Sequence, residues 1–387
     1  MTPDVPYDFT PLLRLALLGL VLACVPLAWL WLRNRGAPSA QRQRALTLLI
    51  LFLTFDLVLF GAFTRLTDSG LGCPDWPGCY GSASPVGARA QIDVAQTAMP
   101  TGPVTHGKAW IEMIHRYLAT MVGALILVLA ASSWAAARRR SATLSPWWPT
   151  LTLLWVCIQG AFGALTVTMK LYPTIVTLHL LGGMVLLALL AAQAQAGAPA
   201  PLAPLALSPR LRAATWGVAG LSALQIALGG WVSTNYAVLA CSDFPLCHGS
   251  WWPEMDFAGG FTVRRELGRQ ADGSYLSFAA LVAIHYVHRL VAYLLLGALA
   301  TLAWVLWARR DQSLRRWAVA LSAVAAWQLA SGLSNVLLSW PLLGAVAHTA
   351  GAAALVLVLT LLLVRARPML SSAAPNGHAR PAPTPSS

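Results

Sequence analysis

Charged side chains are scarce in this chain: they make up 10% of its 387 residues, whereas 57% of the residues are hydrophobic. A soluble protein with so little charge has too few polar groups to cover its surface, so the composition excludes an ordinary water-soluble globular protein. Apolar runs of about 20 residues, long enough to cross a bilayer core, recur along the sequence. We count nine, at about residues 12–32, 45–65, 111–134, 148–168, 174–195, 213–235, 279–307, 317–339 and 342–364.

Acidic residues are half as common as basic ones, 13 against 26, which gives a net charge of +13. Such a charge is compatible with nucleic-acid binding, but the arginines are spread over every second loop, and the intervening loops hold nearly all the acids. This is the positive-inside pattern of membrane proteins. We therefore expect an integral protein of a bacterial cytoplasmic (inner) membrane, surrounded by lipid, without a nucleic-acid partner. Its N-terminus is expected outside and its C-terminus in the cytoplasm.

The first apolar run lacks the basic segment that precedes a cleaved signal; its positive charge follows the run instead. We therefore expect it to remain as a helix. Lipid offers no partners for backbone polar groups, so all nine runs are expected to be helical. The predicted fold class is an all-α polytopic membrane protein with nine transmembrane helices.

The chain also repeats itself in tandem. Four landmarks recur in one order after 168 to 173 residues: the pair Cys73 and Cys79 as Cys241 and Cys247, His115 as His288, Gln159 as Gln328, and His179 as His348. Each repeat spans four helices, and an even number gives both repeats the same orientation in the membrane. The sequence thus predicts two parallel four-helix repeats that follow one extra N-terminal helix.

The repeat divides the chain into five segments. Residues 1–44 hold the extra helix and a basic cytoplasmic loop, and residues 45–196 form the first repeat. A Pro/Ala linker over 197–209 leads to the second repeat at 210–367. The tail, residues 368–387, is rich in Pro, Ser and Ala and is expected to be disordered.

Ionisable side chains inside membrane helices are costly, so each marks a candidate functional site. Four histidines related by the repeat lie on the order of 10 Å below the outer ends of their helices: His115, His179, His288 and His348. Two histidines on two helices of one four-helix unit suit axial ligation of a heme iron. Helix-packing histidines are one alternative, and zinc is a weaker one because structural zinc sites usually include thiolates. Which histidines share an iron stays open.

Three further side chains accompany these histidines. Arg116 and Arg289 directly follow two of them and suit heme propionates, with lipid headgroups as the alternative. Glu112 lies one turn before His115 on the same helix face, and its counterpart in the second repeat is His285. A carboxylate in one half only favours one reacting heme and one electron-carrying heme. Glu112 is therefore a candidate catalytic acid–base group, with a water-facing glutamate as the alternative.

Both cysteine pairs fall in long outer segments, where disulfides persist. We predict the bonds Cys73–Cys79 and Cys241–Cys247, each closing a small loop over the histidines beneath it. A structural clasp is the expected role, and a redox role is the alternative.

Several motifs follow one another in a characteristic order: GAFTRLTDSGLGCPDWPGC, EMIHR, TLHLLGG, CSDFPLC, HYVHRL and AHTAGA. Over about residues 45–365 the chain thereby resembles the heme A synthase family. The resemblance implies oxidation of a methyl group of heme O to the formyl group of heme A by successive hydroxylations. The product would serve terminal oxidases of the cytochrome aa3 kind.

By the same resemblance, the first repeat holds the substrate heme at His115 and His179, with Glu112 as the catalytic residue. The second repeat would hold a permanent heme b at His288 and His348. The resemblance also implies a heme O synthase that supplies the substrate and an electron-transfer partner of unknown identity. A homo-oligomer is left open. The family core has eight helices, so the first helix of this chain is expected to be an addition.

Two other functions compete with this one. A di-heme b electron-transfer protein needs the same four histidines but has no use for an acid in one half only. A transporter also commonly contains parallel repeats, but it is expected to have broken helices and a polar site at the membrane midplane. Here the ionisable residues concentrate toward the outer third.

Overall fold

The computed structural model describes residues 10–141, 144–198, 204–270 and 272–368. Within these ranges nine helices are long and apolar enough to cross a membrane. They are α1 (Thr10–Arg33), α2 (Ser39–Leu66), α4 (His106–Arg138), α5 (Trp147–Thr168), α6 (Pro173–Ala196), α7 (Pro209–Thr234), α9 (Phe278–Ala308), α10 (Gln312–Leu337) and α11 (Leu342–Arg365). The prediction of an all-α polytopic membrane protein is confirmed.

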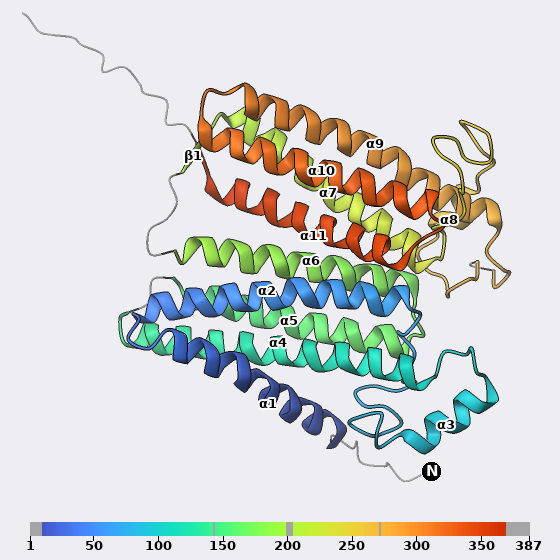
Figure 1. The fold of residues 1–387 in the computed structure, drawn as a ribbon, viewed down its shortest axis with the longest axis horizontal. Coiled ribbons are helices and arrows are strands. Elements are labelled where there is room, and N and C mark those ends of the chain that lie inside the picture. The colour runs from blue at the N-terminus through green and yellow to red at the C-terminus, as the bar shows by residue number, and fades with distance from the viewer. Residues whose placement is uncertain (1–9, 142–143, 199–203, 271, 369–387) are drawn as a thin grey trace, which may run out of the picture.

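Four short elements complete the described structure. Helices α3 (Arg89–Ala98) and α8 (Phe257–Phe261) lie in the two long connections, residues 67–105 and 235–277. We call the end of the bundle that carries these connections the loop end. At the opposite end, where Figure 1 labels β1 (Leu205–Leu207), this strand pairs in parallel with β2 (Ala366–Pro368). The predicted Pro/Ala linker is thus tied to the end of α11, whereas the tail after Pro368 lies outside the described residues.

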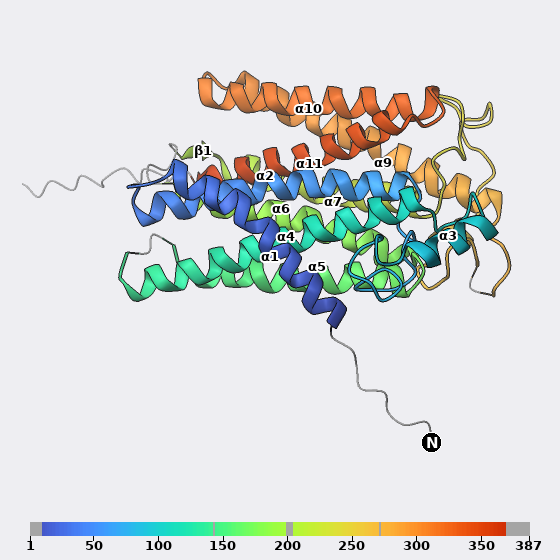
Figure 2. The same cartoon turned by 60° about the horizontal axis from the view of Figure 1, so that its bottom comes forward.

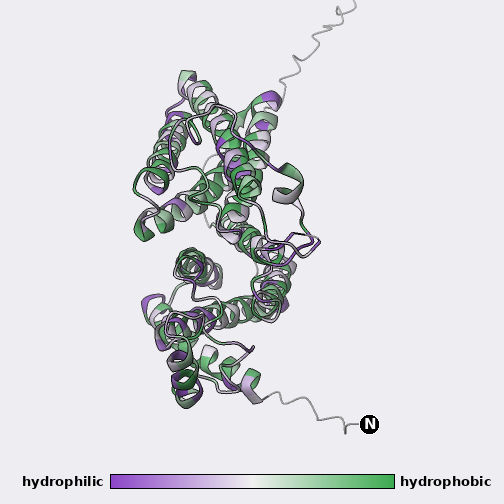
Figure 3. Cartoon of the chain, turned by 90° about the vertical axis from the view of Figure 1, so that its right-hand side faces the viewer, coloured by the Kyte–Doolittle hydropathy of each residue, from purple (hydrophilic) through white to green (hydrophobic). Residues whose placement is uncertain are grey.

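The long helices are hydrophobic on nearly all sides, which is typical of membrane spans and not of amphipathic surface helices. Large apolar side chains remain exposed along the bundle, among them Val25, Trp304 and Leu343 at 72%, 70% and 81% exposure. Figure 3, viewed from the loop end, shows green hydrophobic residues on the outward sides of the helices as well as between them. These outward surfaces suit contact with lipid.

Helix contacts divide the bundle into two groups of four, which separate into a lower and an upper set in Figure 3. In the first group α2 contacts α4, α4 contacts α5, α5 contacts α6, and α6 returns to α2. In the second group α7, α9, α10 and α11 close a ring in the same way. The groups meet where α6 contacts α7 and α11, and where α2 contacts α11. The tandem parallel repeat itself stays a prediction.

Helix α1 stands outside both rings. It packs against α4 and, less extensively, α2, and Figure 2 shows it crossing the outside of the first group. Close packing on α4 depends on Gly19, because a Cβ atom at this position would lie 2.4 Å from Cγ2 of Thr120. Near the loop end, Leu15 is buried in one cluster with Cys73, Cys79 and Met113. Helix α1 therefore packs against the first disulfide loop and supports it.

Local signals fix where the histidine-bearing helices begin. Oγ1 of Thr105 accepts a hydrogen bond from the Lys108 amide at the start of α4, and Oγ of Ser277 accepts one from the Ala280 amide at the start of α9. These are ordinary N-caps for exposed backbone amides. Helix α6 begins with Pro173, a residue well suited to the first helical position. The starts of these helices set the depth of the histidines that follow.

Candidate functional site

The four histidines lie at similar depths below the loop end. Each stands between six and ten residues from the first residue of its helix: His115 on α4, His179 on α6, His288 on α9 and His348 on α11. Each four-helix group thus contains two of them, on helices that are not adjacent in sequence. This is the arrangement that the repeat predicts.

Every one of these imidazole rings rests against a glycine of the neighbouring helix. A Cβ atom added at the glycine would approach the ring carbon Cε1 to 3.0 Å for Gly61 and His115, 3.5 Å for Gly163 and His179, 3.1 Å for Gly229 and His288, and 3.3 Å for Gly332 and His348. Glycine leaves the space in which each ring lies. Sequence reasoning missed these four residues, although the repeat offset also relates Gly61 to Gly229 and Gly163 to Gly332.

Each group contains one histidine pair, His115 with His179 in the first and His288 with His348 in the second. In the first group the Nδ1 atoms of both histidines are buried and have no hydrogen-bond partner. A buried polar atom without a partner is uncommon in folded proteins. Two imidazoles from two helices of one four-helix group fit the axial ligation of a heme iron.

The alternative of a zinc site has no donor set in the part of the chain that the structure describes. No three side chains of His, Cys, Asp or Glu converge there. The histidines occur as two pairs instead, and the ring of Phe60 stacks on that of His115 with centroids 6.2 Å apart. Aromatic and glycine surfaces around an imidazole pair suit a flat macrocycle better than a compact tetrahedral ion.

Above the histidines, both predicted disulfides are present. The S–S distances are 2.08 Å for Cys73–Cys79 and 2.01 Å for Cys241–Cys247. An aspartate folds each loop, because Asp75 accepts from the amides of Tyr80 and Gly81, and Asp243 accepts from those of His248 and Gly249. The hydrogen bond from Gly249 is the main reason that the pKa of Asp243 lies below its ordinary value.

Arg116 and Arg289 fasten these loops to the helices beneath them. Nη1 of Arg116 donates to the carbonyl oxygens of Asp75, Pro77 and Gly78, at 3.1, 3.3 and 2.5 Å. Arg289 donates in the same way to the carbonyl oxygens of Cys241, Asp243 and Leu246, at 2.8 to 2.9 Å. Both guanidinium groups are buried. Their binding of heme propionates stays a prediction, and the structure adds this clamping role.

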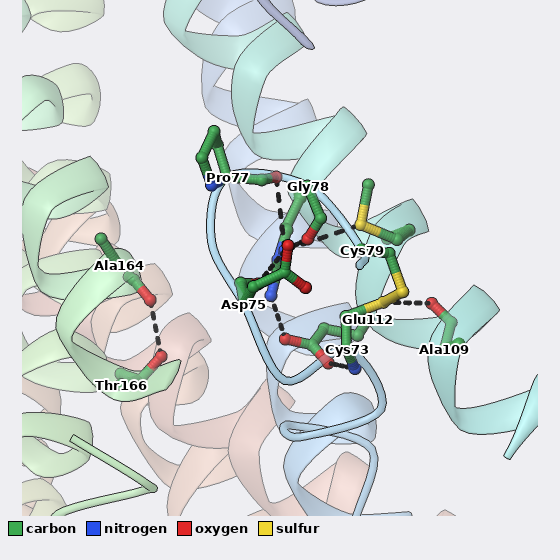
Figure 4. Close-up of polar contacts among 12 residues, drawn as sticks. Cys73, Asp75, Pro77, Gly78, Cys79, Ala109, Glu112, Ala164 and Thr166 are labelled. Atoms are coloured by element: carbon green, nitrogen blue, oxygen red, sulfur yellow. Dashed lines mark hydrogen bonds and ion pairs between the residues drawn. A yellow bond between two sulfur atoms is a disulfide. The ribbon is translucent and has the colours of Figure 1, made fainter. Parts of the chain in front are cut away.

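Glu112 is buried beneath the first loop, with 4% of its surface exposed. Its Oε1 accepts from Nη2 of Arg116 at 2.5 Å, and its Oε2 accepts from the backbone amide of Cys73 at 2.8 Å. Figure 4 shows the carboxylate pointing at the loop that the disulfide closes. The alternative of a water-facing glutamate is therefore wrong. A catalytic role for Glu112 stays a prediction.

His285 replaces Glu112 in the second group and makes comparable contacts without a negative charge. Its Nδ1 lies 3.0 Å from the carbonyl oxygen of Ala237, and its Nε2 accepts from Nε of Arg289 at 3.0 Å. Each arginine clamp thus has an acceptor one turn before it. The acceptor is a carboxylate in the first group and an imidazole in the second.

A comparison with protein families matches residues 43–360 to the COX15-CtaA family, which is described as cytochrome oxidase assembly protein. The chain belongs to this family. The matched region contains both disulfide loops, Glu112 and all four histidines, and it begins after the end of α1.

Individual members of this family are similar over most of their length. Heme A synthase of Shewanella oneidensis is 36% identical over 320 residues, which cover 80% of this chain and 92% of that protein. Heme A synthase of Methylobacterium sp. (strain 4-46) is 32% identical over 378 residues, covering 89% and 97%. Heme A synthase of Caulobacter vibrioides is 30% identical over 347 residues, covering 81% and 93%.

Proposed function

We propose that this protein is a heme A synthase, which oxidises a methyl group of heme O to the formyl group of heme A through successive hydroxylations. One observation carries the proposal. Two pairs of half-buried histidines, one in each four-helix group, lie within the region shared with relatives of that name. A bound heme supplies the redox chemistry, and the protein supplies the ligands, their orientation and an environment shielded from water.

The two pairs are assigned different hemes. His115 and His179 hold heme O as substrate, and His288 and His348 hold a heme b that transfers electrons. The division is supported by Glu112, which lies one turn from His115 and has a histidine as its counterpart in the second group. Arg116 and Arg289 keep the disulfide loops over the two sites and are assigned as the residues that would bind the heme propionates.

Glu112 is assigned the proton-transfer role in the first group. Its Oε1 and Oε2 are held by Arg116 and the Cys73 amide, so the carboxylate is fixed one turn from His115. A fixed carboxylate in a buried site accepts or returns a proton without first having to be ordered. The clamp on the loop and the position of the proton acceptor are thereby linked through one arginine.

The membrane and the orientation of the protein in it are inferred from the distribution of charge among the loops. We assign the protein to the bacterial inner membrane with the disulfide loops outside and the arginine-rich connections in the cytoplasm, as positive-inside loops require. Heme O is then supplied by a heme O synthase, and electrons pass between the heme b half and a separate redox partner. The oxidising outer compartment suits the two disulfides.

The test is to express the full chain in a host that makes heme O but no heme A, and to identify the extracted hemes by chromatography and mass. We expect heme A or its hydroxylated intermediate to accumulate with the intact chain. They should not accumulate with a His115→Ala, His179→Ala variant. Well-folded protein that yields only heme b and unmodified heme O would overturn the proposal.

A second candidate is a di-heme b electron-transfer protein. It is favoured by the bonds of Glu112, because an ion pair to Arg116 and a hydrogen bond to the Cys73 amide give the carboxylate a sufficient structural role. Heme A formation by the intact chain separates the two functions, and its loss on substituting Glu112 with both hemes still bound would assign the chemistry to this group.

A further inference from the structure

The two histidines of the second group are held by hydrogen bonds from the neighbouring helices. Nε2 of Gln225 on α7 lies 3.1 Å from Nδ1 and 3.3 Å from Nε2 of His288, and it donates to the carbonyl oxygen of His288 at 3.1 Å. Gln225 stands one turn before Gly229, against which the same ring rests. The ring of His288 is thus held by two positions on one helix.

His348 has a corresponding support on α10. Oγ of Ser331 lies 3.0 Å from Nδ1 of His348, and Nε2 of Gln328 donates to the carbonyl oxygen of His348 at 3.2 Å. The same Oγ donates its hydrogen to the carbonyl oxygen of Trp327 at 2.7 Å. Its lone pairs therefore remain free to accept a hydrogen bond from the N–H at Nδ1 of His348.

The first group has no such bonds at the same positions of the repeat. Leu57 stands where Gln225 does and Phe162 where Ser331 does, and neither side chain has a hydrogen-bonding group. Gln159 corresponds to Gln328, but its amide lies against Gly182, where an added Cβ would be 2.0 Å from its Nε2. Among the residues described, Nδ1 of His115 and of His179 accordingly has no partner.

A histidine that ligates iron through Nε2 carries its proton on Nδ1, and an acceptor for that proton fixes the ring and makes it a stronger ligand. Ser331 offers its Oγ. Gln225 offers Oε1, which is buried without a partner. If the side-chain amide is turned by 180°, Oε1 takes the position of Nε2 beside the ring. The second group thus contains an acceptor for each histidine ligand, whereas the described residues of the first group place none at Nδ1 of His115 or of His179.

We propose that Gln225 and Ser331 are positioning residues that fix His288 and His348, so that the second group retains its heme while the first group, lacking these bonds, exchanges its own. The inference rests on the proposed function, in which one heme is permanent and the other must enter as substrate and leave as product. Hydrogen bonds to the histidines of the second group would favour retention of its heme. Apolar surroundings of the histidines in the first group would allow its heme to exchange.

The test compares the intact chain with the Gln225→Leu, Ser331→Ala double variant, purified in detergent. We expect heme b to bind about 10- to 100-fold more weakly, as is typical when the partner of a metal-ligating histidine is removed. The midpoint potential of the remaining heme b should rise, because a less basic imidazole stabilises ferric iron less. Low-spin electron paramagnetic resonance signals report the change in ring orientation.

Ser222→Ala is the matched control, since Ser222 is buried on α7 one turn before Gln225 and donates only to the carbonyl oxygen of Val218. Ser331→Thr keeps the hydroxyl and should restore the potential that Ser331→Ala alone shifts. The reciprocal Leu57→Gln, Phe162→Ser variant should retain more heme O after purification.

Full heme b content and an unchanged potential in the double variant would overturn the inference. If that variant does not fold, Ser331→Ala alone tests the inference, because at the histidine rings it removes only the hydrogen bond to Nδ1 of His348. These readouts do not require heme A to form. A wild-type protein that binds heme b but makes no heme A would therefore overturn the proposed function and leave this comparison intact.

Discussion

Nη2 of Arg116 donates to Oε1 of Glu112 at 2.5 Å, while Nη1 of the same guanidinium holds the carbonyl oxygen of Gly78 at the same distance. One side chain therefore connects the acid proposed for catalysis to the disulfide loop that covers it. In the second group, Arg289 connects its loop to His285 in the same manner. The clamp is shared by the two groups, but the negative charge is present in one only.

Replacing Glu112 by Gln should lower heme A formation by about 10²- to 10⁴-fold, the usual contribution of a positioned acid–base group. Glutamine keeps one acceptor oxygen, which can bond to Arg116 or to the Cys73 amide but not to both, and it leaves all four histidines unchanged, so both hemes should remain bound. Extracted heme A per mole of folded protein measures the effect. Asp93→Asn, a change of an exposed carboxylate that contacts His106, is the control. Undiminished heme A formation would show that the catalytic assignment of Glu112 is wrong.

Replacing Arg116 by Ala should destabilise the protein by about 3–5 kcal/mol, because it leaves the buried charge of Glu112 without its partner. The loop between Cys73 and Cys79 should also become accessible to proteases. Thermal unfolding in detergent measures the first effect and limited proteolysis the second. Arg89→Ala removes an exposed pair with Asp93 at 3.9 Å and should cost at most about 1 kcal/mol. Equal effects of the two variants would argue against the clamp.

Replacing Gly229 by Ala should reduce heme b content, because the new Cβ would lie 3.1 Å from Cε1 of His288 and force the ring to move. We expect a loss of about 10-fold in heme affinity, the range typical of a misoriented metal ligand. Pyridine hemochrome spectra of the purified protein measure it. Gly220→Ala lies on the same helix with nothing within 4 Å and should retain its heme. Normal heme content in both variants would exclude a role for this contact.

The second loop should loosen in acid. Hydrogen bonds, chiefly from the Gly249 amide, hold the pKa of Asp243 below the ordinary 3.8, so its stabilising effect is present above that value. It is lost as the pH falls through the lower pKa of the folded state. Hydrogen exchange of the Gly249 amide should therefore become less protected in that range, and Asp243→Asn should lower the protection at neutral pH. Protection that does not depend on Asp243 would contradict this assignment.

Much of the fold could be predicted from the sequence, because an apolar run of the right length allows few structures in lipid. The run expected at 148–168 is helix Trp147–Thr168, for example. Helix α4 begins before the expected apolar run at 111, because the first turn contains the polar His106 and Lys108 and is capped by Thr105. The β1–β2 pair was missed because Leu205 and Ala366 meet only when the chain is folded.

The candidate site was predictable in its identities and less so in its contacts. The repeat offset singles out the four histidines and both disulfides without any structure. The burial of Glu112 depends on the path of the loop from Cys73 to Cys79, which spacing alone does not define. The closeness of Gly61 to His115 depends in turn on how α2 packs against α4.

The central claim is that the two histidine pairs hold different hemes, and it is tested most directly by identifying the hemes that two variants retain. His179→Ala and His348→Ala would each be purified from a host that makes heme O but no heme A. We predict that His179→Ala keeps heme b and loses heme O, whereas His348→Ala loses heme b and keeps heme O. Loss of the same heme from both variants, or the reverse pattern, would contradict the account.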